Sequence, residues 1–337
     1  MTATAFRATA PEDLPALTGF FAERFGRPWT PEEWTWKYGT FPGEARSWLA
    51  VLAEDDGEIL AHAGALRLPA RWRGAETGVW TLVDWAGTSR RGLRPPLVDL
   101  GRRLLADLPR AGDAPWIFGF PSERHFRLGE RVFGYKPLAD FMELAGDIPE
   151  GTAMALRSGD SCGDWAEAVW EACGVDGVRR SAAFLNWRYY ARPHRYYRFY
   201  RLESRGIEGL AVFAFVGEEA WGAELWLPAA GGEWYSSLLA VAADLRAAGL
   251  RRWRFWPPPS GLGLEEVLAR LGLRPTAERR FIGCRGGTGS TDPANDPIES
   301  AGPSRPRGAG GRASRRSAPG RRRWSRVGAA RRRDRRG

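Results

Sequence analysis

The chain has 337 residues, enough for two ordinary domains or one large one. Hydrophobic residues make up 43% and charged residues 27%, so a packed core is expected and disorder along the whole chain is excluded. Three cysteines and three histidines lie scattered without CxxC or HxxxH spacing, which argues against a disulfide scaffold and against a bound metal. No apolar run approaches a membrane span and no signal peptide begins the chain, so we expect a cytoplasmic protein.

The net charge of +10 is concentrated at the C-terminal end. Residues 285–337 hold 15 arginines and four acidic residues, whereas the first 284 residues hold 35 basic and 36 acidic groups. From residue 286 onward the sequence is rich in Gly, Pro, Ser, Ala and Arg, which predicts a disordered basic tail over 286–337. The tail is either a solvated segment without a partner or one that makes weak electrostatic contact with nucleic acid.

The first part of the chain predicts a strand hairpin followed by alternating strands and helices. Leu14, Leu17 and Phe20 form one apolar stripe of a helix, and the turn at residues 55–57 joins two strands. In chain order the expected elements are strand Phe6–Thr9, helices Pro11–Phe25 and Glu32–Tyr38, strands Ser47–Ala53, Glu58–Leu68 and Val79–Trp85, helix Pro95–Leu108, strand Trp116–Phe120, helix His125–Phe133 and a closing strand Leu138–Leu144.

The second part repeats this order of elements. The expected elements are helices Asp164–Cys173 and Ala182–Tyr190, strands Tyr197–Glu203, Leu210–Val216 and Ala220–Leu227, helix Glu233–Ala248, strand Arg252–Trp256, helix Leu264–Leu271 and a final strand Arg279–Cys284. We therefore expect an α+β fold of two tandem domains, each a mixed, mostly antiparallel sheet flanked by helices. The domains are predicted to cover residues 1–145 and 146–285.

Short sequence repeats support two similar units. The pattern W-[KR]-Y-x-x-x-P occurs at Trp36 and again at Trp187. Residues 120–122 and 134–137 are echoed by residues 258–260 and 272–275 at a common offset of 138 residues. Blocks matched in the same order indicate an internal repeat.

The loop from the strand Val79–Trp85 into the next helix is the strongest candidate for a ligand site. It contains Arg90, Arg91, Gly92 and Arg94, and a strand-to-helix loop offers free backbone N–H groups and the positive end of a helix dipole. Pyrophosphate is the ligand that this arrangement suits best, with the arginines as additional donors. This segment alone is equally consistent with an ordinary basic turn between a strand and a helix that binds no ligand.

In the context of the whole unit, the sequence resembles the GCN5-related N-acetyltransferase (GNAT) superfamily. Phe6-Arg7-Ala8-Thr9, the hairpin around Gly57 and the strand, loop and helix at residues 79–108 carry the resemblance. The family loop reads [QR]-x-x-G-x-[GA]; Gly92 and Leu97 fit its spacing, but Ser89 and Arg94 depart from it. The resemblance implies an N-acetyltransferase that uses acetyl-CoA as co-substrate, with contacts from Trp85, Ala86, Arg90, Arg91, Gly92, Leu93 and Arg94.

The resemblance also suggests where the catalytic groups lie. Family members commonly use a carboxylate in the strand before the loop and a tyrosine in the following short helix. Asp84 occupies the first position, but the tyrosine position falls near Glu130. Glu123, His125 and Tyr135 are substitutes nearby, and we expect Asp84, Glu123 and Tyr135 to be the catalytic residues. A loop-capping role for Asp84 is the alternative.

The second unit lacks a comparable loop, because no basic residue lies between Leu227 and the acidic Glu233. We therefore expect the first unit to bind the cofactor and the second to shape a site for a small-molecule or sugar amine. Trp34, Trp36, Trp187 and Tyr189 either stack on that acceptor or pack helix against sheet.

Two other functions remain open. Fused GNAT-like units also resemble the FemAB-type aminoacyl transferases. Such an enzyme would need a basic surface large enough for tRNA, which the net charge of −1 over the first 284 residues does not indicate. A catalytically inactive GNAT scaffold acting as a binding module would fit the departures at Ser89 and Arg94.

Overall fold

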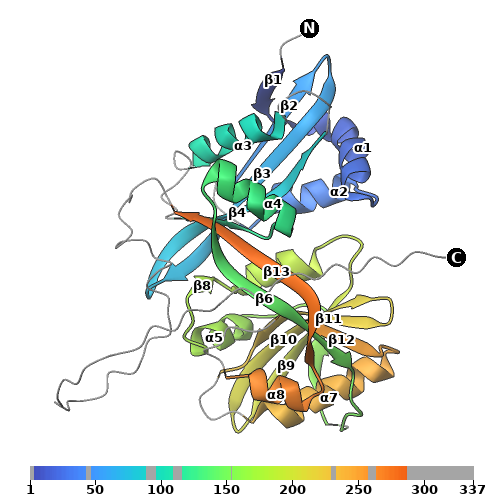
Figure 1. The fold of residues 1–337 in the computed structure, drawn as a ribbon. Helices are drawn as coiled ribbons and strands as arrows, with labels where there is room; N and C mark the ends of the chain where they lie inside the picture. The colour runs from blue at the N-terminus through green and yellow to red at the C-terminus, as the bar shows by residue number, and fades with distance from the viewer. Residues whose placement is uncertain are drawn as a thin grey trace, which may run out of the picture.

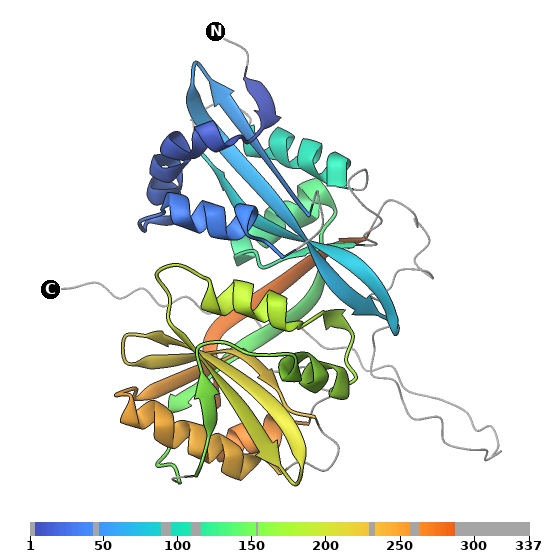
Figure 2. The ribbon, with the colours of Figure 1, turned by 180° about the vertical axis from the view of Figure 1, so that it is seen from behind.

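The structure is a computed structural model that describes residues 4–42, 47–88, 96–108, 116–152, 154–228, 233–256 and 263–286. The expected phosphate loop around Gly92 and the expected tail beyond residue 286 lie outside these residues. The described chain forms one sheet in the order β1-β2-β3-β4-β5-β13-β6-β12-β11-β10-β9-β7, with helices on both faces (Figures 1 and 2). This is the expected α+β architecture of mixed sheets flanked by helices.

The first half of the sheet is built by the N-terminal elements and lies at the top of Figure 1. Its strands are β1 (Ala5–Ala8), β2 (Trp48–Asp55), β3 (Glu58–Trp72), β4 (Ala75–Gly87) and β5 (Trp116–Gly119), and its helices are α1 (Leu14–Phe25), α2 (Pro31–Trp34), α3 (Pro96–Asp107) and α4 (Glu123–Phe133). Helix α3 packs on β2 and β3 (Figure 1), whereas α1 and α2 cover the opposite face (Figure 2). The alanines Ala61, Ala63 and Ala65 of β3 cluster with the leucines of α3, because small side chains let the helix approach the sheet closely.

The β3–β4 hairpin is longer than the sequence predicts. Strand β3 continues past Leu68 to Trp72, and β4 begins at Ala75 rather than at Val79. Residues 69–78 include a proline and several charged residues, and this local composition favours a loop over a strand. The extension is instead held by the second half: Ala70 pairs with Val178 of β8 (Gly177–Val178), and Arg71 pairs with Glu171.

The second half repeats this arrangement in the lower part of Figure 1. Its strands are β7 (Arg157–Gly159), β9 (Tyr197–Ser204), β10 (Ile207–Val216), β11 (Glu219–Trp226) and β12 (Arg252–Phe255), and its helices are α5 (Trp165–Ala172), α6 (Ala182–Leu185), α7 (Trp234–Ala247) and α8 (Glu265–Arg270). Strands β4 and β5 are parallel, and so are β11 and β12. The short strands β7 and β8 carry no sequence pattern that predicts them.

Two long strands join the halves. Strands β6 (Lys136–Asp147) and β13 (Arg274–Gly286) run side by side between them (Figures 1 and 2). The strand expected to close the first unit, β6, pairs with β12 of the second half, while the last strand, β13, pairs with β5 of the first. The expectation that each unit closes its own sheet is therefore wrong, although the boundary near residue 145 stays a prediction. Every strand offers the same backbone hydrogen-bonding groups, so the sequence of β6 or β13 does not predict which edge of the sheet the strand will join.

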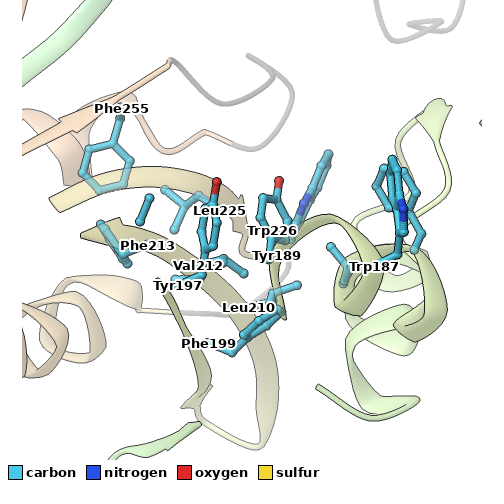
Figure 3. Close-up of a cluster of buried hydrophobic side chains, with 14 of the residues drawn as sticks. Trp187, Tyr189, Tyr197, Phe199, Leu210, Val212, Phe213, Leu225, Trp226 and Phe255 are labelled. Carbon is cyan, nitrogen blue, oxygen red and sulfur yellow. The ribbon is translucent and has the colours of Figure 1, made fainter. Parts of the chain in front are cut away.

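A pair of tryptophans marks the contact between the halves. Trp36 and Trp187 stack with ring centroids 5.2 Å apart, and each indole Nε1 donates to the other's backbone oxygen, at 2.6 and 2.7 Å. Trp187 and Tyr189 are also buried members of the main apolar cluster, which contains residues of both halves and, from the second half, Phe199, Leu210 and Phe213 (Figure 3). The contact that Trp36 and Trp187 make with each other joins the helical segments of the two halves and is not the expected packing of helix against sheet.

Candidate functional site

A bulge in β4 sets the geometry of the candidate site. His62 pairs with Ala86 and Gly64 with Val83, so Asp84 and Trp85 together lie opposite the single residue Ala63. Asp84 has a φ of +53°, which is uncommon outside glycine. A bulge of this kind re-aims side chains and ends regular pairing.

The Asp84 carboxylate is held by two neighbouring residues. Lys37 Nζ lies 2.6 Å from Oδ1, and the Tyr38 hydroxyl donates to Oδ2 at 2.8 Å. Both come from the five-residue π-helix η2 (Thr35–Gly39), which continues α2; the sequence predicts an ordinary helix over 32–38. Thr30 and Glu33 form a capping box with Pro31 in the first turn, which fixes where α2 begins.

Burial and charge act in opposite directions on Asp84. Its burial raises the pKa of the carboxyl, but the Lys37 ammonium and the hydrogen bonds from Lys37 and Tyr38 outweigh this and leave the pKa below its ordinary value. Burial and the adjacent carboxylate both raise the pKa of Tyr38. Asp84 is therefore an anion with satisfied partners, and Tyr38 is a neutral donor.

Beneath the bulge lies a buried histidine. His62 Nδ1 is 2.9 Å from the backbone oxygen of Asp84, and its Nε2 has no hydrogen-bond partner among the described residues. Burial lowers the pKa of His62 below its ordinary value, which keeps the ring neutral. Since Phe21 and Trp34 pack on it edge-on, we assign His62 to the support of the bulge.

Strands β4 and β5 separate immediately beside the bulge. They pair only at Trp80 with Ile117 and at Thr81 with Phe118. Beyond Thr81, no described strand pairs with this edge of β4, and a cavity of about 430 Å³ opens between the two strands. Its walls come from β4, the end of β5 and the segment after it, α3, α4 and the residues after α4, and the C-terminal end of α1. They include Val83, Asp84, Trp85, Leu97, Phe120, Ser122, His125, Phe133 and Tyr135.

The cavity gathers some of the sequence-predicted site residues but not others. Asp84, Trp85 and Tyr135 line it, and Ala86 is buried just beyond them. Glu123 is not a lining residue; it pairs with Arg127 on the exposed side of α4 at 2.7 Å. Arg90, Arg91, Gly92, Leu93 and Arg94 lie outside the described residues.

On the wall of the cavity formed by α4 and the residues after it, the side chains of His125 and Tyr135 carry ionisable groups. Burial raises the pKa of Tyr135, so its hydroxyl stays protonated. His125 Nδ1 lies 3.2 Å from Ser122 Oγ, which also caps α4. An apolar cavity that holds a neutral hydroxyl, an imidazole and a fixed carboxylate is suited to proton transfer.

Sequence reasoning missed Lys37 and Tyr38 as site residues. The signal was present, because the repeated W-[KR]-Y pattern places a cation and a tyrosine at corresponding positions in each half. In the second half Tyr189 donates to Glu224 at 2.6 Å, as Tyr38 donates to Asp84 in the first.

The second half also has an opening between parallel strands. β11 and β12 pair from Glu219–Arg252 to Gly222–Phe255 and then separate beside a bulge at Ala223. A cavity of about 480 Å³ lies there. The two halves thus share a strand separation next to a bulge, with a buried carboxylate in the bulge (Asp84) or beside it (Glu224).

Known proteins share this architecture. The sequence matches no protein-family model and no curated protein. Among solved structures, the GCN5-related N-acetyltransferases of Kribbella flavida and Anabaena variabilis are 14% and 11% identical to this chain, with TM-scores of 0.59 and 0.60. In both cases the match covers 84% of this chain and 72% of the other.

The chain has a GNAT fold. A conserved protein of unknown function from Enterococcus faecalis is also similar, at 12% identity and a TM-score of 0.60, over 85% of this chain and 73% of that one. The expected GNAT resemblance is thus confirmed at the level of the fold.

Two further features concern the described part of the chain. No described helix is long and apolar enough to cross a membrane. The described residues also contain no group of three or more His, Cys, Asp or Glu side chains that could hold a metal ion.

Proposed function

We propose that the protein is an acyl-CoA-dependent N-acyltransferase that moves an acetyl group from acetyl-CoA to an amine of a small molecule or sugar. The observation that carries the proposal is the separation of β4 from β5 next to the Asp84 bulge, in a GNAT fold. A free strand edge beside an apolar cavity suits an extended chain containing amide groups, because such a chain adds to the edge as a further strand would. The arm of an acyl-CoA is a chain of this kind.

The proposed reaction needs two proton transfers, one to the leaving thiolate and one from the attacking amine. The amine nitrogen attacks the thioester carbon, and the carbon–sulfur bond breaks. The Tyr135 hydroxyl gives its proton to the departing thiolate, and His125 takes the proton that the amine nitrogen loses. Histidine is the residue type suited to proton transfer near neutral pH.

Asp84 has a different role in this proposal from that of a base. Its carboxylate already pairs with Lys37 and accepts from Tyr38, which makes it a weak proton acceptor. We assign it to holding the bulge, and thereby the position of the thioester next to the amine. Positioning of two reactants contributes a large share of the rate in such reactions. No role is assigned to Glu123.

Two measurements on the full chain test the proposal. Calorimetry with acetyl-CoA is expected to show saturable binding, whereas an inactive scaffold without a donor site would give no heat. Release of free CoA thiol in the presence of a panel of amines then measures transfer.

A tyrosine variant tests the assignment of the acid. Tyr135→Phe is expected to lower kcat by about 100-fold or more with little change in KM for acetyl-CoA, since it removes only the proton donor. Tyr196→Phe, at an exposed position of the second half, is the matched control and should keep full activity. An unchanged kcat in Tyr135→Phe would remove Tyr135 from the mechanism.

A further inference from the structure

The cavity of the second half differs from that of the first in its charge. Five arginines and two glutamates line it. The side chains with a basic nitrogen or a carboxylate that line the first cavity are those of Arg27, Asp84 and His125. The arginines are Arg188, Arg192, Arg195, Arg254 and Arg280, and the glutamates are Glu143 and Glu224.

Both glutamates are already engaged. Glu143 accepts from Arg254 at 2.8 Å and from Arg280 at 3.2 Å. Glu224 accepts from Arg180 at 3.0 Å, from the Tyr189 hydroxyl at 2.6 Å and from Trp226 Nε1 at 2.7 Å. Of the remaining arginines, Arg188 is close enough to Glu224 for its charge to help raise the Arg188 pKa, but neither glutamate accepts a hydrogen bond from Arg188, Arg192 or Arg195 among the described residues.

Three guanidinium groups consequently have no carboxylate hydrogen bond among the described residues. Arg188 Nε donates to the Tyr189 hydroxyl at 3.2 Å, and Arg192 Nη1 to the Tyr197 hydroxyl at 3.0 Å. The undescribed segments that follow β11 and β12, residues 229–232 and 257–262, contain no acidic residue in the sequence.

Arg192 is the most confined of the three. Its guanidinium lies 5.2 Å from the ring centre of Trp36, and burial, together with the like charges of Arg188 and Arg195, lowers its pKa. Confining like charges together is unfavourable, and a bound anion relieves it.

The floor of the cavity is aromatic. The rings of Tyr189 and Tyr197 stand side by side, 4.9 Å apart, and their hydroxyl groups point to the same side, away from the buried Phe199 and Leu210 (Figure 3). Trp221 and Trp256 are partly exposed at the rim. The opening therefore combines donors for an oxyanion with flat apolar surface for the rest of a small organic molecule.

We propose that the opening between β11 and β12 is a binding site for a small organic anion, whose phosphate or carboxylate group is held by Arg188, Arg192 and Arg195. The site is distinct from the cavity between β4 and β5 and does not depend on acyl transfer there. The two cavities adjoin where Phe120, which lines the first, contacts Trp256, which lines the second, at 5.3 Å between ring centres.

Calorimetry on the full chain with inorganic pyrophosphate and with citrate tests the site. At least one probe is expected to bind, and Arg192→Gln and Arg195→Gln are each expected to weaken that binding by about 10-fold, the typical effect of one lost charge-assisted hydrogen bond. Arg195 makes no described contact that folding depends on, so its variant covers the case in which Arg192→Gln unfolds. Pyrophosphate binding alone identifies a phosphate site and citrate binding alone a carboxylate site.

Two controls separate this cavity from other cationic surface. Arg102→Gln changes an exposed arginine of α3 and should leave the affinity unchanged. A triple change of Arg321, Arg322 and Arg323 to Gln probes the arginine-rich C-terminal segment. Absence of binding by both probes, equal affinity in the wild type and both cavity variants, or weakening only in the triple variant would overturn the proposal.

Discussion

In or beside each bulge lies a carboxylate that is buried and hydrogen-bonded. Asp84 is paired with a lysine and a tyrosine, and Glu224 with an arginine, a tyrosine and a tryptophan. A buried ion pair adds little to stability when compared with apolar packing, but removal of one partner is costly because it strands the other charge. These groups therefore fix the shape of the strand openings.

Removal of the lysine should expose this dependence. Lys37→Met leaves the Asp84 carboxylate, whose side chain is 8% exposed, without its cation. We expect a loss of about 3 kcal/mol in the free energy of unfolding at neutral pH, measured by urea denaturation. Arg102→Met, which breaks an exposed pair with Asp99, should change the stability little.

The effect should depend on pH in a defined direction. In the wild type the pKa of Asp84 is depressed, so the stability that its ionised form contributes is present above the ordinary carboxyl range, near pH 4, and is lost as the pH falls through the depressed value. In the variant, the charge and hydrogen bond of Lys37 no longer oppose the effect of burial, so the pKa of Asp84 is higher than in the wild type. The stability difference should therefore shrink as the pH is lowered, and a difference that stays constant down to pH 3 would contradict this account.

At the scale of elements, the β3 residue next to the bulge must be a glycine, Gly64, which pairs with Val83. A Cβ on Gly64 would lie 2.3 Å from the Tyr38 hydroxyl oxygen and 3.2 Å from the Val83 carbonyl oxygen. Tyr38 is the donor to Asp84, so the side chain that must move is the one that supports the bulge.

Gly64→Ala is therefore expected to lower the free energy of unfolding by about 1–3 kcal/mol and to weaken binding of acetyl-CoA. Gly19→Ala in α1 is the matched control, because a Cβ there meets nothing within 4 Å and helix propensity favours alanine. The control should be as stable as the wild type or more so. Equal stabilities of the two variants in urea would show that the Tyr38 contact imposes no constraint.

Most elements could be predicted because their patterns are local. The apolar stripe of α1, the turn after Asp55 and the helix at α3 all follow from neighbouring residues. The π-helix η2 and the extended β3–β4 hairpin could not be predicted, because distant partners decide them: Asp84 holds Lys37 and Tyr38, and Val178 pairs with Ala70. For the same reason Asp84 and Tyr135 could be proposed from sequence, but their distances and partners could not.

At the scale of the whole molecule, the positions of β6 and β13 bind the halves together. The sequence predicts both strands but not the edges that they join, because backbone hydrogen bonding does not depend on which half a strand belongs to. In the structure, β5 depends on a strand from the end of the described chain, and β12 on one from before the second half. Cooperative behaviour follows from this reciprocal dependence.

Equilibrium unfolding in urea should therefore give a single transition, with coincident curves from far-ultraviolet circular dichroism and tryptophan fluorescence. Residues 1–150 and 151–337 produced separately should be unfolded or aggregated, and they should co-purify when produced together. Two resolved transitions, or a well-folded monomeric first fragment, would show that the halves close independently.

The pairing of β5 with β13 also has a consequence for biosynthesis. The edge of β5 that includes Gly119 is covered only once Gly283 of β13 has been synthesised, although β5 leaves the ribosome far earlier. At translation rates of about 5–20 residues per second, that interval is roughly 8–30 seconds. During it the nascent chain presents an open strand edge, so this protein is expected to depend on chaperones while it is being made.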